Sequence, residues 1–522
     1  MTPLSALIET PARGYASSTI PYRLRPTTAS PAIDRGLDQS HAPLVEALRA
    51  YHDADMLPFT VPGHKKGRGI APELSDILGD GAFRGDIPLA GGLDDLQMTG
   101  DLLTSAERLA ADAFGAQRTF FGVGGSSLSN QIALLSIVGP DDEVIVARNA
   151  HKSTYAALIL SGAHPIYVQP CYDADLDVAH GVSAANLAAT LDAHPRARAA
   201  LVVSPTYYGV AADLPALADV CHARGVALLV DEAWAAHFAF HPALPPSAMA
   251  AGADLSVTSV HKVLTGFSQS SLINVQGNLV SSERVAQWVG LLGTTSPSAL
   301  ILASIDACRR DMMLHGYAHL ERTLALSARA RAALAALPNL QVLGSEVVGR
   351  PGAAALDATK LVIDVTGTGM TGYAVDAWLR DQWNIAVELS DHRRVLALLT
   401  VADDADSVGR LLQALSHLSA AATRERSAPR TMVVPLPALA TDAVMTPRAA
   451  VAAPSRRVRL ADAVGSIAAE LLTPYPPGIP IAAPGERITR PMVEYLGAGL
   501  AHGMYVTGAS DPSLQMVSVV QH

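Results

Sequence analysis

The chain has 522 residues, 49% of them apolar and 16% charged, which is typical of a folded globular protein. Because a single hydrophobic core stops growing near about 250 to 300 residues, we expect more than one domain. The formal charge of -10, with no run of basic residues, argues against binding to nucleic acid or to an anionic membrane surface.

The N-terminal region shows no regular periodicity. Residues 1 to about 40 are rich in Pro, Ser, Thr and Ala, which predicts an irregular arm. The start of the chain lacks a basic region followed by an apolar core, and no run of 18 apolar residues occurs, so we expect a cytoplasmic protein. Cys171, Cys221 and Cys308 lie far apart without a CxxC pair, which indicates reduced packing residues rather than disulfides or a zinc site.

From about Asp142 to Gly277, short apolar runs alternate with amphipathic stretches such as TYAALILSGA and LPALADVCHARG. Apolar runs of this kind are typical of strands buried on both faces, and the stretches between them are predicted helices. The pattern predicts an α/β domain with a mainly parallel sheet. The predicted strands are EVIVAR, PIYVQP, AALVVSP, VALLVDEA, DLSVTSV and LINVQG.

After about Leu300 the pattern becomes helical, and KLVIDV, IAVEL and VLALLTV then predict strands of a smaller α/β unit. Residues 422 to 456 shift to Ala, Pro, Thr and Arg, which indicates a linker or crossing segment. We therefore divide the chain into an N-terminal segment, a large domain, a small α/β domain, and a linker with a C-terminal domain. Their predicted bounds are 1–58, 59–315, 316–425 and 426–522.

The strand DLSVTSV ends in Ser259, Val260, His261 and Lys262. In an open parallel sheet, ligands bind at the carboxyl ends of the strands. A lysine there can form an imine with an aldehyde cofactor, and Ser259 and His261 offer donors for a phosphate. By itself the motif is short, and an ordinary surface lysine after a strand explains it as well.

The strand VALLVDEA delivers Asp231 at its carboxyl end, 31 residues before Lys262. A carboxylate beside a pyridine nitrogen keeps that nitrogen protonated, and the protonated ring accepts electrons from a substrate. The alternative is that Asp231 is only a helix N-cap.

Two weaker signals precede Asp231. In FFGVGGSSLSNQIALL, Gly124 and Gly125 allow close backbone approach, and Ser126 and Ser127 open an apolar helix whose first N–H groups can cradle a phosphate. In RNAHKST, His151 stands where a strand meets a helix, so its ring could stack on a pyridine. An ordinary turn and a capping histidine are the alternatives.

The order of these signals is more informative than any one of them. A glycine-serine turn, a histidine, a strand-end aspartate and a strand-end lysine follow one another at the spacing of successive α/β units. This is the layout of the large domain of fold-type I enzymes that use pyridoxal 5'-phosphate, with an aminotransferase-like seven-stranded sheet. Four independent signals that agree on one site favour this class.

The sequence also resembles the bacterial ornithine/lysine/arginine decarboxylase family, group III, from about Phe59 to Leu496. The stretches that carry the resemblance are PFTVPGHKKGRG, GGLDDL, FGAQRTFFGVGGSSLSN, VARNAHKS, SPTYYGV, LLVDEAWAAHFAFHPALPPSAMAAGADLSVTSVHK, TTSPSALILASIDACRR and TPYPPGIPIAAPGERIT. The resemblance implies decarboxylation of arginine, lysine or ornithine to the amine and carbon dioxide, with pyridoxal 5'-phosphate as the cofactor and no metal.

The resemblance also implies a role for each matching residue. Lys262 would bind the cofactor aldehyde, Asp231 the ring nitrogen, and His151 and Trp234 would lie beside the ring. The phosphate would be held by Gly125, Ser126, Ser127, Ser259 and His261. Thr295 and Ser296 would reach the phosphate of the partner subunit, so that a homodimer is the smallest active unit.

The chain departs from the family's pattern in two places. Many short members carry a glutamate where this chain has Leu89, which leaves the choice of substrate open. The receiver-like N-terminal domain of the long members is not expected here. Glu486 and Asp391 are candidates for binding the distal cation of the substrate, and His64 and Lys65 look like a border motif of the active site.

Two other readings stay open. On the same fold an aminotransferase, or an oxygen-dependent decarboxylase-deaminase, would use the same cofactor. Arg393 or Arg394 could then clamp the substrate carboxylate. A non-catalytic homologue is the other reading, although such proteins usually lose the lysine or the aspartate, and both residues are present here.

Overall fold

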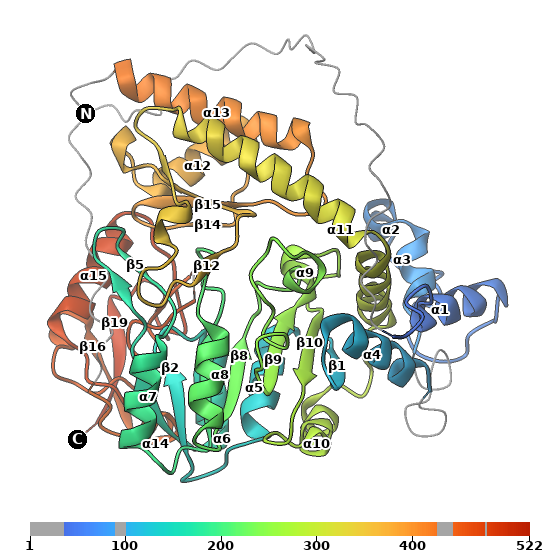
Figure 1. Ribbon diagram of the computed structural model, residues 1–522, viewed down its shortest axis with the longest axis horizontal. Coiled ribbons are helices and arrows are strands. Elements are labelled where there is room, and N and C mark those ends of the chain that lie inside the picture. The colour runs from blue at the N-terminus through green and yellow to red at the C-terminus, as the bar shows by residue number, and fades with distance from the viewer. Residues whose placement is uncertain (1–35, 89–100, 425–441, 476–477, 522) are drawn as a thin grey trace.

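The computed structural model describes residues 36–88, 101–424, 442–475 and 478–521. Its centre is a seven-stranded sheet with the strand order β1-β10-β9-β8-β6-β2-β3 (Figure 1). In chain order the strands are β1 (Arg118–Gly122), β2 (Glu143–Ala147), β3 (His164–Val168), β6 (Ala199–Val203), β8 (Ala227–Asp231), β9 (Leu255–Ser259) and β10 (Ser271–Val275).

The sheet is mainly parallel, as the sequence predicted. Neighbouring strands from β9 through β8, β6 and β2 to β3 run parallel, whereas β10 is antiparallel to both β9 and β1. All six strands predicted between residues 142 and 277 are present. Phe120, Phe121 and Gly122, which the sequence indicated only as the approach to a turn, belong to β1.

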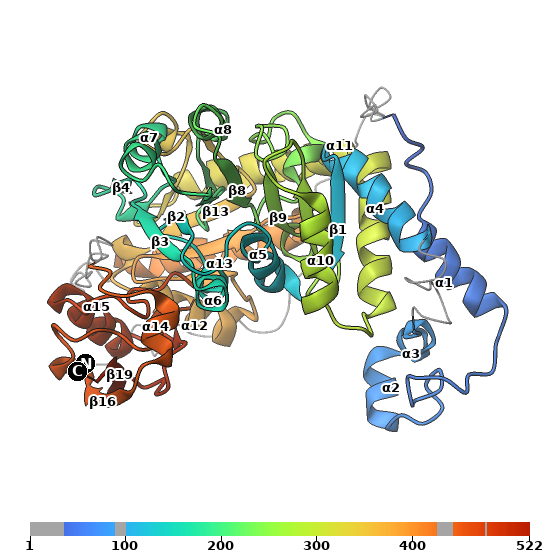
Figure 2. The same ribbon diagram turned by 90° about the horizontal axis from the view of Figure 1, so that it is seen from below.

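The strands are buried on both faces because helices cover both sides of the sheet (Figure 2). In β8, Leu229 packs in the core on one face, while Leu228 and Val230 pack in the core on the other. This is the two-residue alternation expected of a central strand. The covering helices are α5 (Gly125–Leu135), α6 (Lys152–Ser161) and α10 (Ser282–Leu292) on one face, and α7 (Ala184–Ala193) and α8 (Leu214–His222) on the other.

The helical region after residue 300 is one long helix, α11 (Ala299–Ala335), that runs from the large sheet to a small one (Figure 1). The small sheet is antiparallel, with the order β11-β13-β15-β14. Our domain division stays a prediction, and its boundary at 315 and 316 falls inside α11. The elements of this part are β11 (Gln341–Val342), β13 (Lys360–Asp364), β14 (Leu389–Ser390), β15 (Arg394–Leu398), α12 (Gly372–Trp383) and α13 (Ala405–Arg424).

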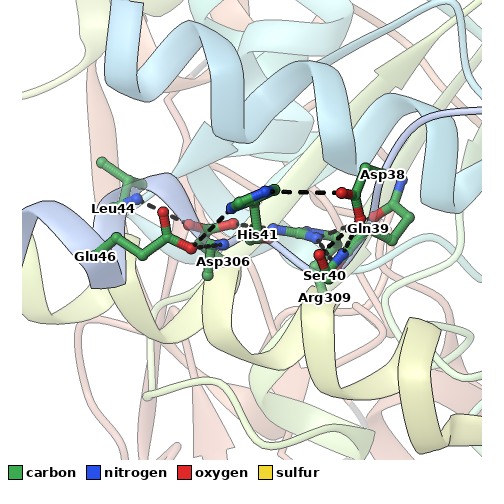
Figure 3. A network of polar contacts seen from close by, with 9 residues as sticks. Asp38, Gln39, Ser40, His41, Leu44, Glu46, Asp306 and Arg309 are labelled. Carbon is green, nitrogen blue, oxygen red and sulfur yellow. Dashed lines mark hydrogen bonds and ion pairs between the residues drawn. The ribbon is translucent and has the colours of Figure 1, made fainter.

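The described N-terminal residues are anchored on α11 by buried charges (Figure 3). Asp306 accepts a hydrogen bond from the backbone N–H of Leu44 at 2.9 Å, and Arg309 donates to the carbonyl of Gln39 at 3.1 Å. The two charged side chains pair with each other at 2.5 Å. Four helices follow, α1 (Pro43–Asp53), α2 (Pro72–Leu78), α3 (Asp80–Gly85) and α4 (Asp101–Phe114).

A C-terminal unit packs beside α6 and the edge of the large sheet that carries β2 and β3 (Figures 1 and 2). In this unit, α15 (Arg490–Ala501) and two short antiparallel strand pairs pack around a separate apolar core. Its elements are α14 (Pro447–Ala452), β16 (Ser455–Arg459), β17 (Thr473–Pro474), α15 (Arg490–Ala501), β18 (Val506–Thr507) and β19 (Met516–Val520). The remaining short strands are β4 (Tyr172–Asp173), β5 (Val178–Ala179), β7 (Val210–Ala211) and β12 (Ala355–Leu356).

A buried ion pair ties the C-terminal unit to the large domain. Arg148, directly after β2, lies 2.8 Å from the carboxylate of Glu486, and their side chains are 0% and 1% exposed. Arg148 also donates to the carbonyls of Pro480 at 2.7 Å and Ile481 at 3.2 Å. One guanidinium therefore satisfies several acceptors that the docking of the two units buries.

We expect Arg148→Met to destabilise the protein by about 3 to 5 kcal/mol, because it leaves the Glu486 carboxylate buried without a counter-charge. Chemical denaturation followed by circular dichroism measures the change. The double variant Arg148→Met/Glu486→Leu removes both charges and should recover most of the loss. Additive losses in the double variant would contradict this account of the pair.

Some sequence-based expectations fall outside the described residues. These are the arm up to residue 35, Leu89, the GGLDDL motif and most of the linker region. In the part of the chain that the structure describes, no helix is both long and apolar enough to cross a membrane.

Candidate active site

The predicted residues at strand ends meet at the carboxyl edge of the large sheet. β8 ends at Asp231, and its parallel neighbour β9 ends at Ser259, where the short helix α9 (Val260–Val263) begins. Lys262 lies in α9, so the parallel pairing of β8 and β9 brings it to the same edge as Asp231. Burial lowers the pKa of the Lys262 amine, whereas the carboxylates of Asp231 and Glu388 raise it.

Trp234 forms the floor beside Lys262. The Lys262 Nζ lies 4.3 Å from the centre of the indole ring, and the ring itself is only 7% exposed. The indole Nε1 is buried and has no hydrogen-bond partner in the described residues. An unpaired buried donor next to a reactive amine indicates that a ligand completes this site.

Asp231 is buried and held in a fixed orientation. Its Oδ2 accepts a hydrogen bond from the Asn130 amide at 2.8 Å, and its Oδ1 accepts one from the backbone N–H of Ala233 at 3.2 Å. Burial raises the pKa of Asp231, and the charge of Lys262 and these two donors oppose the rise. A cationic ring nitrogen at this position would further stabilise the carboxylate.

The residues predicted to bind a phosphate differ in their surroundings. Ser126 Oγ lies 2.6 Å from Ser259 Oγ, which joins the first turn of α5 to the end of β9. Gly125 has φ +67°, a left-handed conformation that favours glycine, and its N–H donates to the carbonyl of Gln269 at 2.8 Å. The start of α5 has no side-chain cap, so the N–H groups that follow in its first turn can bind a phosphate. Ser127 is exposed, and His261 turns its Nδ1 to the carbonyl of Ser270 at 2.8 Å.

His151 is both a helix cap and a wall of the site. Its ring accepts a hydrogen bond from the backbone N–H of Ser153 at 3.3 Å, so His151 is the N-cap of α6. The alternative of a capping histidine is therefore also correct. Burial and the nearby lysines lower the pKa of His151 to about 3, so the ring is neutral. A Cβ added at Gly478 would come within 2.9 Å of this ring, so the C-terminal unit closes against it.

The structure adds two residues that sequence reasoning missed, Lys360 and Glu388. Lys360 begins β13, is fully buried, and lies with its Nζ 4.2 Å from the centre of the Trp234 ring. It donates to the carbonyl of Tyr207 at 3.0 Å, and burial lowers its pKa to about 7. The only signal in the sequence was a lysine at the start of an apolar strand.

Glu388 lies just before β14 and interacts electrostatically with both Lys262 and Lys360. Burial raises its pKa, while the two amines lower it. Glu388 thus brings a carboxylate from the small domain to the lysine of the large domain. Its side chain is exposed to solvent, and nothing in IAVEL set it apart from other surface glutamates.

Other candidates lie apart from Lys262 or are already engaged. Thr295 and Ser296 are exposed between α10 and α11, where Ser296 makes hydrogen bonds with Thr294. Glu486 is committed to Arg148, and Asp391 pairs with Arg394 at 3.2 Å. His64 pairs with Asp86, directly after α3, at 3.1 Å, and Lys65 donates to the nearby carbonyl of Thr60.

The residues present fit pyridoxal 5'-phosphate. The site offers partners for a polar aromatic ring at one end and for a phosphate at the other. These are the unpaired Trp234 Nε1, the oriented Asp231 carboxylate, the Ser126 and Ser259 hydroxyls, and the first turn of α5, which has no side-chain cap. Lys262 supplies the amine for its aldehyde.

Models of two domains match the chain. The Orn/Lys/Arg decarboxylase major domain covers residues 42–407, and the C-terminal domain of the same family covers residues 428–504. The chain belongs to the Orn/Lys/Arg decarboxylase family. The resemblance found in the sequence is therefore confirmed, and the protein is a decarboxylase, a lyase that acts on a basic amino acid.

Relatives of this family match nearly the whole chain. It is 39% identical to an arginine decarboxylase of Bacillus subtilis over 93% of this chain and 99% of that protein. It is 40% identical to an arginine decarboxylase of Halalkalibacterium halodurans over 92% of this chain and 98% of that protein. A lysine decarboxylase of Pseudomonas aeruginosa is 28% identical over 87% of this chain and 75% of that protein.

Solved structures confirm the fold. The lysine decarboxylase of Francisella novicida superposes with a TM-score of 0.79 at 21% identity, covering 92% of this chain and 81% of that one. The predicted α/β class with a mainly parallel seven-stranded sheet, of fold-type I, is therefore right.

Proposed function

We propose that this decarboxylase holds pyridoxal 5'-phosphate on Lys262 and that arginine is its preferred substrate. The observation that carries the proposal is the set of groups around one amine. Lys262 Nζ lies over Trp234, next to the oriented Asp231 carboxylate and near the paired Ser126 and Ser259 hydroxyls. Arginine is favoured because relatives matching nearly the whole chain at 39% and 40% identity are arginine decarboxylases.

When bound, the cofactor supplies a protonated ring that accepts the electron pair left by carbon dioxide. The chain's own residues prepare for this. Asp231, fixed by Asn130, would keep the ring nitrogen protonated, and neutral His151 would lie beside the ring without adding a charge. Ser126, Ser259 and the first turn of α5 would hold the phosphate, together with Ser127, His261 and Gly125.

Lys262 would hold the cofactor through its aldehyde, and it is the amine that the substrate's amino group would replace. Burial lowers the pKa of Lys262, which favours the neutral form that a nucleophile requires. Glu388 interacts electrostatically with this amine, its side chain is exposed, and it is our candidate for attracting the cationic side chain of the substrate, in place of Glu486 and Asp391.

The contacts of the two arginines favour decarboxylation over transamination. Arg393 lies 3.0 Å from Asp364 and Arg394 lies 3.2 Å from Asp391, so both guanidiniums are engaged by carboxylates. Neither appears among the charges that act on Lys262. Neither arginine is therefore placed as a clamp for a substrate carboxylate beside Lys262.

We further propose a cytoplasmic homodimer in which Thr295 and Ser296 of each chain reach the phosphate of the partner. Both side chains are exposed on the loop between α10 and α11 and are free of contacts with the Lys262 pocket of their own chain in the described residues. Sedimentation of the holoenzyme tests the dimer, and Ser296→Ala should weaken cofactor retention if the loop serves the partner.

The substrate is tested by competition. The cofactor-loaded protein is incubated in air with equal arginine, lysine and ornithine, and the products are identified by mass spectrometry together with the carbon dioxide released. We expect agmatine to form in step with carbon dioxide and faster than the other two amines. A keto acid, or oxygen uptake with a deaminated product, would replace the decarboxylase proposal by one of the two other reactions.

A further inference from the structure

Lys360 reaches from the small domain to the edge of the large sheet that carries the site. Its side chain is fully buried, and its Nζ donates to the carbonyls of Thr206 at 3.3 Å and Tyr207 at 3.0 Å, in the turn between β6 and β7. The same Nζ lies 4.2 Å from the centre of the Trp234 ring, in the turn after β8. An ammonium group has three donors, and two carbonyls and one ring face offer a partner for each. One amine thus joins two turns that follow neighbouring parallel strands.

Among the described residues, no hydrogen bond orients the Trp234 indole. Its Nε1 is buried and unpaired there, and the ring packs edge-on against Tyr207 with centres 6.1 Å apart. Apolar neighbours and two amines remain to hold the ring, and the second amine, Lys262, lies 4.3 Å from the ring centre. The attraction between an ammonium group and an indole face is strongest in a desolvated site. Because Lys262 has to react with the cofactor, Lys360 is the amine whose contact with the ring need not change.

A buried polar network in the small domain lies beside Lys360. Asp357 accepts a hydrogen bond from the Thr359 hydroxyl at 2.7 Å and lies 3.3 Å from Nε2 of His237, three residues after Trp234. The charge of Asp357 also acts on Lys360. Removing the Lys360 amine therefore leaves Asp357 with two polar partners. The contribution of Lys360 to the site can thus be separated from its contribution to stability.

We propose that Lys360 is a positioning residue of this decarboxylase, which holds the Trp234 indole beside the cofactor that Lys262 binds. Its own amine is fully buried and engaged by backbone carbonyls, so Lys360 acts through Trp234 rather than on the substrate. The small domain thereby sets part of the geometry of a site whose cofactor ligands belong to the large domain. The inference rests on the proposed function, because it takes Lys262 as the lysine that carries the cofactor.

The test is Lys360→Met, which keeps the length of the side chain and removes its charge and its donors. Absorbance titration of the cofactor-free protein measures cofactor affinity, and visible circular dichroism at equal absorbance reports the surroundings of the bound cofactor. We expect the dissociation constant to rise about tenfold, the dichroic band to weaken, and kcat to fall about tenfold to hundredfold, as misplacement of a positioning group does. The melting temperature of the cofactor-free protein should not fall, because replacing a buried charge by an apolar side chain of similar size is often neutral or stabilising.

Three further variants locate the effect. Lys152→Met removes another amine near an aromatic ring, that of Tyr475 at 5.1 Å, and should leave the affinity and the dichroic band as in the wild type. In a double-mutant cycle with Trp234→Leu, the effect of Lys360→Met on cofactor affinity should largely disappear, because the ring on which it acts is gone. Lys360→Gln covers the case that Lys360→Met does not fold. Its amide can still donate to a carbonyl but has no charge for the ring, so the same changes are expected.

Other outcomes overturn the inference. Wild-type affinity and a wild-type dichroic band in Lys360→Met, whatever its melting temperature, would make Lys360 a structural residue only. Losses that add fully to those of Trp234→Leu would mean that Lys360 acts through another group. Failure of the proposed function is distinguishable, since Lys262→Ala would then keep the visible absorbance of the bound cofactor, whereas failure of this inference alone leaves Lys262→Ala without it.

Discussion

Lys262→Ala should abolish turnover and the visible absorbance of the lysine-bound cofactor. Among the described lysines, Lys262 is the one that lies over Trp234 and within the field of Asp231, and its burial lowers its pKa, which favours the neutral amine that reacts with an aldehyde. The lysine also moves protons and releases product, so we expect a loss of at least about 10³-fold, within what acid and base groups supply. The measurement is carbon dioxide release together with the spectrum of the purified variant.

Lys152→Ala is the matched control, because Lys152 follows His151 and lies with its Nζ 5.1 Å from the centre of the Tyr475 ring rather than over Trp234. The Lys152→Ala variant should keep the visible absorbance of the lysine-bound cofactor. Borohydride reduction followed by peptide mass analysis should place the cofactor on the peptide that contains Lys262. A cofactor mass on Lys360 instead would reassign the site, since that amine lies 4.2 Å from the same indole centre.

Asp231→Asn should retain the cofactor and lose about 10²- to 10³-fold in kcat. Asparagine keeps the size and the bond to Asn130 in part, but it cannot balance a charged ring nitrogen. The loss corresponds to about 2.7 to 4 kcal/mol, as for other groups that stabilise developing charge. Steady-state rates per bound cofactor measure it.

Asp254→Asn provides the control for Asp231. Asp254 is also a buried strand-flanking carboxylate, but it precedes β9 and accepts from the backbone N–H of Leu228 at 2.8 Å, at the opposite end of the sheet. It should lower the melting temperature while leaving kcat per bound cofactor near that of the wild type. Equal kcat losses in the two variants would show that Asp231 acts through stability alone.

The part of the site that the sequence predicted comes from residues whose placement is local. Asp231, Ser259 and Lys262 each follow an apolar strand directly, and Ser126 opens a helix after a glycine turn. In a parallel α/β sheet the carboxyl ends of strands share one edge, so local patterns determine where such side chains meet. The same reasoning placed His151 at the start of α6.

Residues contributed by other units could not be found in this way. Lys360 and Glu388 belong to the small sheet and reach Trp234 and Lys262 only because α11 carries that sheet over the large one. Glu486 looked like a substrate ligand in PGERIT, yet docking of the C-terminal unit buries it against Arg148. Sequence spacing says nothing about such contacts between units.

The sequence by itself determined the class of fold, the edge of the sheet that carries the chemistry and the lysine on which it depends, because apolar periodicity and strand-end residues are properties of neighbouring positions. Only the tertiary structure decided which distant charges surround that lysine and which carboxylates are already engaged. These contacts depend on how the large domain, the small domain and the C-terminal unit pack together, because a buried charge needs a partner and that packing determines which groups lie close to it.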